Sequence, residues 1–159
     1  MNIEQLGPGS EERLRAIRLR ALRDAPDAFG TTFEEAIARP PETWRHQLEQ
    51  FATFVATEED CDVGLVRGAR HDDLSDVAYL LSLWVAPEAR RRGIAGALID
   101  AVVAWGTGAG FRRLILDVAE SNTAARALYL RSGFVPNGTR GTLPPPRQHI
   151  REVQLERRL

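Results

Sequence analysis

Residues 77–106 read VAYLLSLWVAPEARRRGIAGALIDAVVAWG, and this stretch decides the fold. Its first part is apolar on both faces, which predicts a central strand covered on both sides. One face would hold Val77, Tyr79, Leu81, Leu83 and Val85, and the other Ala78, Leu80, Ser82 and Trp84. Pro87 has no N–H to donate, so the strand ends near Ala86. After Gly93 the apolar residues recur at helical spacing, so an amphipathic helix begins there.

The turn between this strand and this helix is predicted to bind an anion. The first turn of a helix has unpaired N–H groups and lies at the positive end of the helix dipole. Small residues leave the backbone open to a ligand there, and three arginines add positive charge. The residues expected to hold a diphosphate are Arg90, Arg91, Arg92, Gly93, Ile94, Ala95 and Gly96. An exposed basic turn that simply ends in a glycine is the alternative.

Two other nucleotide-binding motifs are absent. The chain contains no lysine, which excludes G-x-x-x-x-G-K-[ST], and no G-x-G-x-x-G follows a strand. The turn instead reads R-x-x-G-x-A from Arg90 to Ala95. Here the sequence resembles the GNAT superfamily of N-acetyltransferases, whose members have Q/R-x-x-G-x-G/A at this place. The resemblance implies that the amides of the turn hold the pyrophosphate of acetyl-coenzyme A.

A second motif lies downstream, after a predicted strand at residues 112–118. From Asn122 to Phe134 the chain reads N-x-x-A-x-x-L-Y-x-x-x-G-F, which is similar to the family's pattern at every fixed position. The resemblance implies that Asn122 binds the pantetheine end of the cofactor and that Tyr129 protonates the leaving thiolate. By its spacing with Ala125 and Leu128 alone, Tyr129 would be a core residue of an amphipathic helix.

Composition limits the function classes. A chain of 159 residues, 43% hydrophobic, suits one domain over residues 1–159. The formal net charge of -1 gives no reason to expect nucleic acid or an anionic membrane as a partner. The single cysteine, Cys61, excludes an intrachain disulfide and a multi-cysteine metal site, and no metal is expected. Without a membrane-length apolar run or a signal sequence, we expect a cytoplasmic protein. A homodimer is left open.

The expected fold is a GNAT-like α/β domain with a mixed, mostly antiparallel sheet of six or seven strands and helices on both faces. Strands are predicted at residues 2–6, 51–57, 63–68, 77–86, 112–118, 135–139 and 151–156, and helices at 10–24, 40–51, 94–106 and 122–132. The resemblance implies that the sheet splays between the fourth and fifth strands. The pantetheine arm would enter this gap as a surrogate strand, bonded to the backbone of Leu83 and Val85.

The loop at residues 24–36 carries two exposed-looking aromatic residues, Phe29 and Phe33, and two acids, Glu34 and Glu35. In the GNAT family this segment overhangs the acceptor site. The alternative is an ordinary connection between helices, in which the two acids begin the next helix. The proline-rich segment at residues 141–148 is predicted to be stiff and to shape a pocket.

The chemistry implied by the resemblance is direct transfer of acetyl from the thioester to an amine. A base must first deprotonate the amine, and the N–H of Val85 is placed to stabilise the oxyanion. Asp117 is the first candidate base, because N-terminal acetylating members have a glutamate at this position; Glu34 and Glu120 are the others. The acceptor is left open among small amines, aminoglycosides, amino acids and protein amines. A catalytically silent coenzyme A sensor or partner-binding module is the alternative function.

Overall fold

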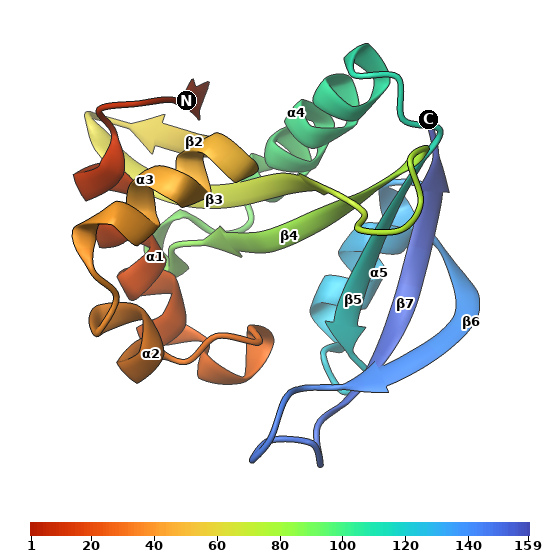
Figure 1. Cartoon of the computed structure of the whole chain (residues 1–159). Coiled ribbons are helices and arrows are strands. Elements are labelled where there is room, and N and C mark those ends of the chain that lie inside the picture. Colours follow the sequence, from red (N-terminus) through yellow and green to blue (C-terminus); the bar gives the residue numbers. More distant parts are fainter.

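The computed structural model describes all 159 residues, which form a seven-stranded sheet in the order β1-β2-β3-β4-β5-β7-β6 (Figure 1). The strands are β1 (Asn2–Leu6), β2 (Ala52–Glu58), β3 (Cys61–Arg70), β4 (Val77–Val85), β5 (Arg113–Ala119), β6 (Val135–Thr142) and β7 (Arg151–Arg158). Only β4 and β5 run parallel, and all other neighbours are antiparallel. The predicted mixed, mostly antiparallel α/β architecture is confirmed.

Five α-helices flank the sheet. They are α1 (Glu11–Asp24), α2 (Phe33–Ile37), α3 (Pro41–Gln50), α4 (Ile94–Gly108) and α5 (Thr123–Arg131), and two 3-10 turns, η1 (Pro26–Ala28) and η2 (Pro87–Ala89), join them to their neighbours. Helices α1 and α3 contact β3 and β2, while α4 packs on β2, β3 and β4. No helix is both long enough and apolar enough to cross a membrane.

Helix α4 lies very close to β3. A Cβ atom built on Gly68 would come within 2.5 Å of the Trp105 ring, and one on Gly64 within 2.9 Å of Leu98. Side chains at these two positions would therefore push the helix away from the sheet. Because successive residues of a strand point to opposite faces, Arg67 between them points toward the side of α1 and α3.

The sheet splays between β4 and β5, as predicted. The two strands pair only from Val77↔Arg113 to Tyr79↔Ile115, and they diverge beyond that point (Figure 1). The amide of Ala86 donates to the Val63 carbonyl on β3 at 2.8 Å. Backbone groups of successive strand residues alternate in direction, so the N–H and C=O of Val85 point into the gap. The open edge of β4 is therefore available to a ligand.

A bulge interrupts β4 before this open edge. Leu65 of β3 pairs with Trp84 of β4, and Arg67 pairs with Leu81. Between these two pairs, β4 therefore has one more residue than β3. Ser82 takes up the extra length with a φ of 60°, in the left-handed region. The alternation of faces predicted from the sequence therefore breaks at Ser82. Nothing in the local sequence marks the bulge, because serine has no special preference for this conformation.

The loop after α1 is more ordered than its sequence suggests. Thr32 and Glu35 form a capping box at the start of α2, with both reciprocal hydrogen bonds at 3.1 Å. The two acids Glu34 and Glu35 do begin a helix, as in the alternative interpretation. The prediction that Phe29 is exposed was wrong: only 6% of this residue is accessible to solvent. Its ring is buried because the Arg18 guanidinium lies over it, 4.8 Å from the ring centroid.

Candidate active site

A cleft of about 880 Å³ opens where β4 leaves β5. Fourteen of its twenty lining residues are hydrophobic, and the arginines lie toward the α4 turn. It is lined by the end of β4 (Leu83, Trp84, Val85), the following turn (Ala89, Arg90, Arg91, Gly93), the start of α4 (Ile94, Ala95, Gly96), one face of α5 (Asn122 to Arg131) and the loop after α1 (Ala25, Ala28, Phe29). Such a cleft suits a long ligand that has an apolar arm and a charged end.

The charged end of the cleft is built on the first turn of α4. Gly93 adopts a φ of 82°, and the first backbone hydrogen bond of the helix runs from Ala97 N–H to the Gly93 carbonyl at 3.1 Å. The N–H groups of Ile94, Ala95 and Gly96 therefore have no backbone partner. A Cβ atom on Gly93 or Gly96 would meet no other atom within 4 Å, so the approach to these amides is open. This geometry suits a phosphate group.

The three arginines of the turn have different surroundings. Arg90 donates from Nε to the Val85 carbonyl at 2.9 Å and pairs with Asp24 through Nη2 at 2.5 Å. Arg92 pairs with Glu58 at 2.9 Å and does not line the cleft. Arg91, with a φ of 63°, lines the cleft and makes no ion pair. Of the three predicted arginines, Arg91 is therefore the one free to meet a ligand.

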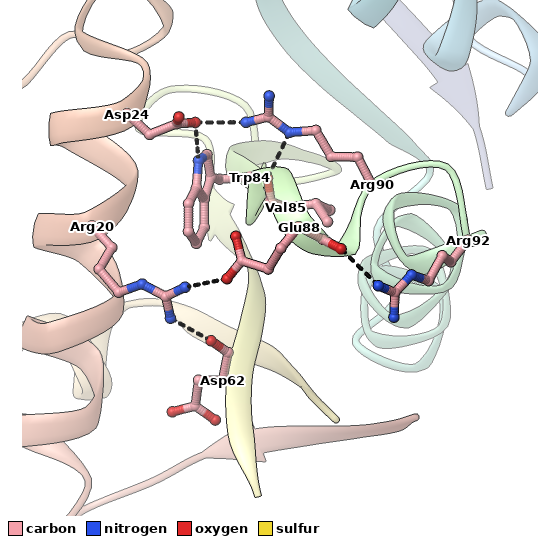
Figure 2. A network of polar contacts seen from close by, with 8 residues as sticks. All are labelled: Arg20, Asp24, Asp62, Trp84, Val85, Glu88, Arg90 and Arg92. Carbon is pink, nitrogen blue, oxygen red and sulfur yellow. Dashed lines mark hydrogen bonds and ion pairs between the residues drawn. The ribbon is translucent and has the colours of Figure 1, made fainter. Parts of the chain in front are cut away.

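Asp24 is a site residue that the sequence did not indicate. Its Oδ2 accepts hydrogen bonds from both Arg90 and the indole Nε1 of Trp84, the latter at 2.9 Å (Figure 2). Nearby, Arg20 bridges Glu88 and the backbone carbonyl of Asp62. These contacts connect α1 to the end of β4 and to η2. They hold the Val85 carbonyl with Arg90, which leaves the Val85 N–H as the free group in the gap.

Four of the fixed residues of the downstream motif line the same cleft, and Asn122 and Tyr129 are the two of them with polar side chains. The side-chain oxygen of Asn122 accepts from the Ala125 amide at 3.1 Å and caps α5, so its amide nitrogen remains available to a ligand. Tyr129 is 8% exposed, and its ring packs edge-on against Phe134. Burial raises the pKa of the Tyr129 phenol, so the hydroxyl keeps its proton at neutral pH. The sequence motif therefore brings Asn122 and Tyr129 to the open edge of β4.

Asp117 lies outside this cleft, on an exposed position of β5, and its Oδ1 accepts from Gln154 Nε2 of β7 at 3.2 Å. It faces away from the buried Leu116 and Val118, as the strand pattern predicts. Burial, with the charge of Asp117 as the second cause, raises the pKa of Glu152. Burial and the same charge raise the pKa of Tyr79. Asp117 and Glu152 thus form an acidic wall on β5 and β7, and Glu152 is a residue that the sequence analysis missed.

Glu34 is exposed on α2 and does not line the cleft, and no hydrogen bond holds its carboxylate. Arg147, from the proline-rich loop between β6 and β7, donates to the carbonyls of Pro26 and Gly30 at 2.5 and 2.9 Å. The loop after α1 and the proline-rich loop are therefore joined, although they are far apart in the sequence. This contact joins the segment expected to overhang the acceptor site to the segment expected to shape a pocket, and both expectations stay predictions.

Known proteins resemble this chain in sequence and in fold. Residues 16–134 match the model of the Acetyltransferase (GNAT) family. Aminoglycoside N(6')-acetyltransferase type 1 from Salmonella enteritidis is 30% identical over 140 residues, which are 84% of this chain and 91% of that protein. Mycothiol acetyltransferase from Stackebrandtia nassauensis is 31% identical over 140 residues, or 84% of this chain and 44% of that protein. A solved GNAT acetyltransferase from Streptococcus pneumoniae has a TM-score of 0.84 at 19% identity, with 99% of this chain and 98% of that chain covered.

Proposed function

The chain belongs to the Acetyltransferase (GNAT) family and is an N-acetyltransferase, and from this premise we propose that acetyl-coenzyme A binds in the cleft between β4 and α5. The observation that carries the proposal is the meeting of three features in one cleft. These are the free amides of the α4 N-terminus, the unpaired edge of β4 and the protonated phenol of Tyr129. The amides suit the diphosphate of the cofactor, the edge of β4 suits its amide-bearing arm, and the phenol suits the leaving thiolate.

Each part of the cofactor has a proposed partner. The amides of residues 94–96 and the Arg91 side chain hold the diphosphate. The pantetheine arm pairs with the open edge of β4 from Leu83 to Val85, and Asn122 donates to it from its free amide nitrogen. A second, polar cavity of about 830 Å³ adjoins at Gly96 and Arg131. We place the nucleotide end of the cofactor toward it.

The transfer then needs three events. The neutral amine attacks the thioester carbonyl, and the N–H of Val85 stabilises the oxyanion that forms. The C–S bond breaks, and Tyr129 protonates or hydrogen-bonds the departing thiolate. A base removes the extra proton from the nitrogen. Asp117 is our first choice for the base, acting through a water because its side chain is short, and its neighbour Glu152 supports a proton-accepting role for this wall. Glu34 is the second choice.

The names of the relatives suggest candidate acceptors. One relative is named for an aminoglycoside and another for mycothiol. We propose an amine as the acceptor, and the panel to test comprises aminoglycosides, amino acids, polyamines and peptides with free N-terminal or lysine amines. The test is release of coenzyme A thiol from acetyl-coenzyme A with each class. Binding of acetyl-coenzyme A by calorimetry without thiol release on any amine would favour the silent sensor instead.

Three further features belong to this proposal. We propose that residues 1–159 act as one domain and that the protein works in the cytoplasm. For the assembly state, a homodimer is the alternative to a monomer. Size-exclusion chromatography with light scattering tests the assembly state directly. None of the residues assigned above depends on a second copy of the chain.

A further inference from the structure

Two arginines are buried on the acceptor side without an acidic partner. Arg18 of α1 is 3% exposed and Arg67 of β3 is 7% exposed. The ion pairs of the structure include neither of them, nor the nearby Arg39. Charged side chains are almost never fully buried unless they are paired, because burial of an unpaired charge costs several kcal/mol or more. These arginines therefore require an explanation.

The contacts of Arg67 are all with neutral groups. Its Nη1 donates to Gln47 Oε1 at 3.0 Å, and its Nε and Nη2 both donate to the Ser82 hydroxyl at 3.1 and 2.8 Å. Its guanidinium lies 4.6 Å from the centroid of the Phe51 ring. These contacts orient the guanidinium but do not neutralise its charge. A hydroxyl that accepts two hydrogen bonds from a cation is a weak substitute for a carboxylate.

Arg18 is less satisfied still. Its Nε and Nη1 are buried and have no hydrogen-bond partner, and the ring of Phe29 is its main contact. Burial, followed by the positive charges of Arg67 and Arg39, lowers the pKa of the Arg18 guanidinium. Arg18, Arg39 and Arg67 are thus close enough to repel one another. We name these three residues the arginine cluster. It contains many hydrogen-bond donors and has no carboxylate partner.

Two neighbouring residues connect the arginine cluster to the proposed transfer site, while Arg18 and Arg67 themselves do not line the cleft. Ser82, which Arg67 holds, is the bulge residue of β4 and directly precedes Leu83 on the open edge. Phe29, which Arg18 covers, lines the cleft. Arg67 points to the side of α1 and α3, opposite α4, where the diphosphate is proposed to bind. The cluster is therefore on the acceptor side of the strand and not on the cofactor side.

We propose that Arg18 and Arg67 bind an oxyanion of the acceptor, a carboxylate or a phosphate, so that the substrate is an amine that carries a negative group. This inference rests on the proposed N-acetyltransferase function and names the acceptor class. The acidic wall of Asp117 and Glu152 would attract the amine end. The three cations of the cluster would repel a polycationic amine. Free amino acids and phosphorylated amines combine an amine with a negative group, as this site requires. Polyamines, and peptide amines without a nearby negative group, do not.

The first experiment compares matched acceptors in the thiol-release assay. Free amino acids are tested against their carboxamides, and phosphorylated amines against the corresponding alcohols. The acid or phosphate member of a pair should have a kcat/KM roughly tenfold to a hundredfold higher, because hydrogen bonds to a charged group are lost in its neutral partner. The class that shows the preference identifies the oxyanion. Equal or better use of the neutral members would overturn the proposal.

Three variants test which residues cause the preference for anionic acceptors. Arg18→Met and Arg67→Met should reduce it to less than about threefold, since one cation of the pair is gone. Arg45→Gln serves as the matched control, because Arg45 is exposed on α3, makes only a 4.0 Å pair with Glu49 and carries the same charge. The control should keep the full preference. A preference that survives in both methionine variants would assign the oxyanion to other residues and sink the inference.

Thermal unfolding provides a readout that does not depend on activity. Methionine is apolar and similar in length, so Arg18→Met should raise the unfolding temperature by about 3 °C or more if Arg18 is an unpaired charge kept for a ligand. Sodium acetate or sodium phosphate should stabilise the wild type beyond sodium chloride of equal ionic strength, but not this variant. A lower unfolding temperature for the variant would mean a structural role and would contradict the proposal.

The same measurements distinguish a failure of the arginine site from a failure of the proposed acetyl transfer. Thiol release without a preference for anionic acceptors leaves the transferase function intact and removes the arginine site. Anion-dependent stabilisation that is lost in Arg18→Met, with no thiol release on any amine, supports the arginine site and overturns the proposed transfer.

Discussion

Tyr129 has the two properties that a proton donor to a thiolate needs. It lines the cleft at the open edge of β4, and burial raises the pKa of its phenol, so the proton is present throughout the neutral range. The same burial would destabilise a phenolate that persisted after Tyr129 had given up its proton. A second proton source must therefore restore the neutral phenol, and the proton taken from the acceptor amine is the natural one.

We predict that Tyr129→Phe lowers kcat by roughly 100-fold or more while the affinity for acetyl-coenzyme A changes little. The ring and its edge-on contact with Phe134 are kept in this variant, so the fold should be unaffected. Steady-state kinetics and calorimetry measure the two effects separately. An unchanged kcat would return Tyr129 to a packing role.

The acidic wall allows a pH prediction with a definite sign. If Asp117 is the base, Asp117→Asn lowers kcat/KM and removes its acidic limb without changing acetyl-coenzyme A affinity. If Glu152 is the base, the limb persists but moves to lower pH. The charge of Asp117 helps to raise the pKa of Glu152, so the pKa falls when that charge is removed. We expect the first result.

Glu34→Gln is the comparison variant for this experiment, because Glu34 is an exposed carboxylate on α2 and the second candidate base. It should keep the wild-type pH profile. Should Glu34→Gln lose the acidic limb while Asp117→Asn keeps it, the base would belong to the loop after α1.

At the scale of elements, the start of α4 is the main structural support for the proposed binding of acetyl-coenzyme A. Three consecutive amides lack partners there, and their dipoles add to the positive end of a fifteen-residue helix. The arginines matter less than the sequence suggests, since Arg90 and Arg92 are paired with acids. The backbone is therefore expected to supply most of the phosphate recognition.

We predict that Gly96→Glu reduces the affinity for acetyl-coenzyme A by more than about 100-fold, because a like charge facing a phosphate costs several kcal/mol. Gly96 is preferable to Gly93 for this test, since Gly93 has a φ of 82° and any side chain there would strain the turn. Gly96→Gln fills the same space without charge and should lose much less affinity. Calorimetry checks both variants, and equal affinities for them would refute electrostatic exclusion.

At the scale of the whole molecule, segments from both ends of the chain meet where we propose that the acceptor binds. Arg147 of the proline-rich loop holds the carbonyls of Pro26 and Gly30 in the loop after α1. The latter loop supplies Phe29 to the cleft and to the arginine cluster. We therefore expect the geometry of the proposed acceptor site to depend on these hydrogen bonds between the loops.

We predict that Arg147→Ala raises the acceptor KM by roughly tenfold, since two hydrogen bonds of about 1 kcal/mol each are lost. The affinity for acetyl-coenzyme A should stay within about twofold, because α4 and β4 are not touched. Arg140→Ala, an exposed residue of β6 with a 3.8 Å pair to Glu120, is the control. A loss of cofactor affinity in Arg147→Ala would show that the loops support the cofactor cleft instead.

The sequence by itself determined the parts of this protein that are local in the chain. The strand at residues 77–86, the turn and the helix after Gly93 follow from hydrophobic period and from the residues that stop or start each element. The open N-terminus of α4 could be predicted because Gly93 and the small residues after it are local in the sequence, and its phosphate binding stays a prediction. The motif from Asn122 to Phe134 could be read because its residues share one short helix and its caps.

Tertiary structure alone decided which distant side chains meet. Asp24 and Arg90 are 66 residues apart, and Arg67 of β3 meets Ser82 at the bulge of β4. The burial of Phe29 depends on an arginine of the preceding helix that lies over its ring. Such contacts are set by the packing of α1 against the sheet, and each arginine alone reads as a solvated charge. The residues proposed to bind the cofactor could therefore be named from the sequence, whereas those proposed to bind the acceptor are brought together only by the fold.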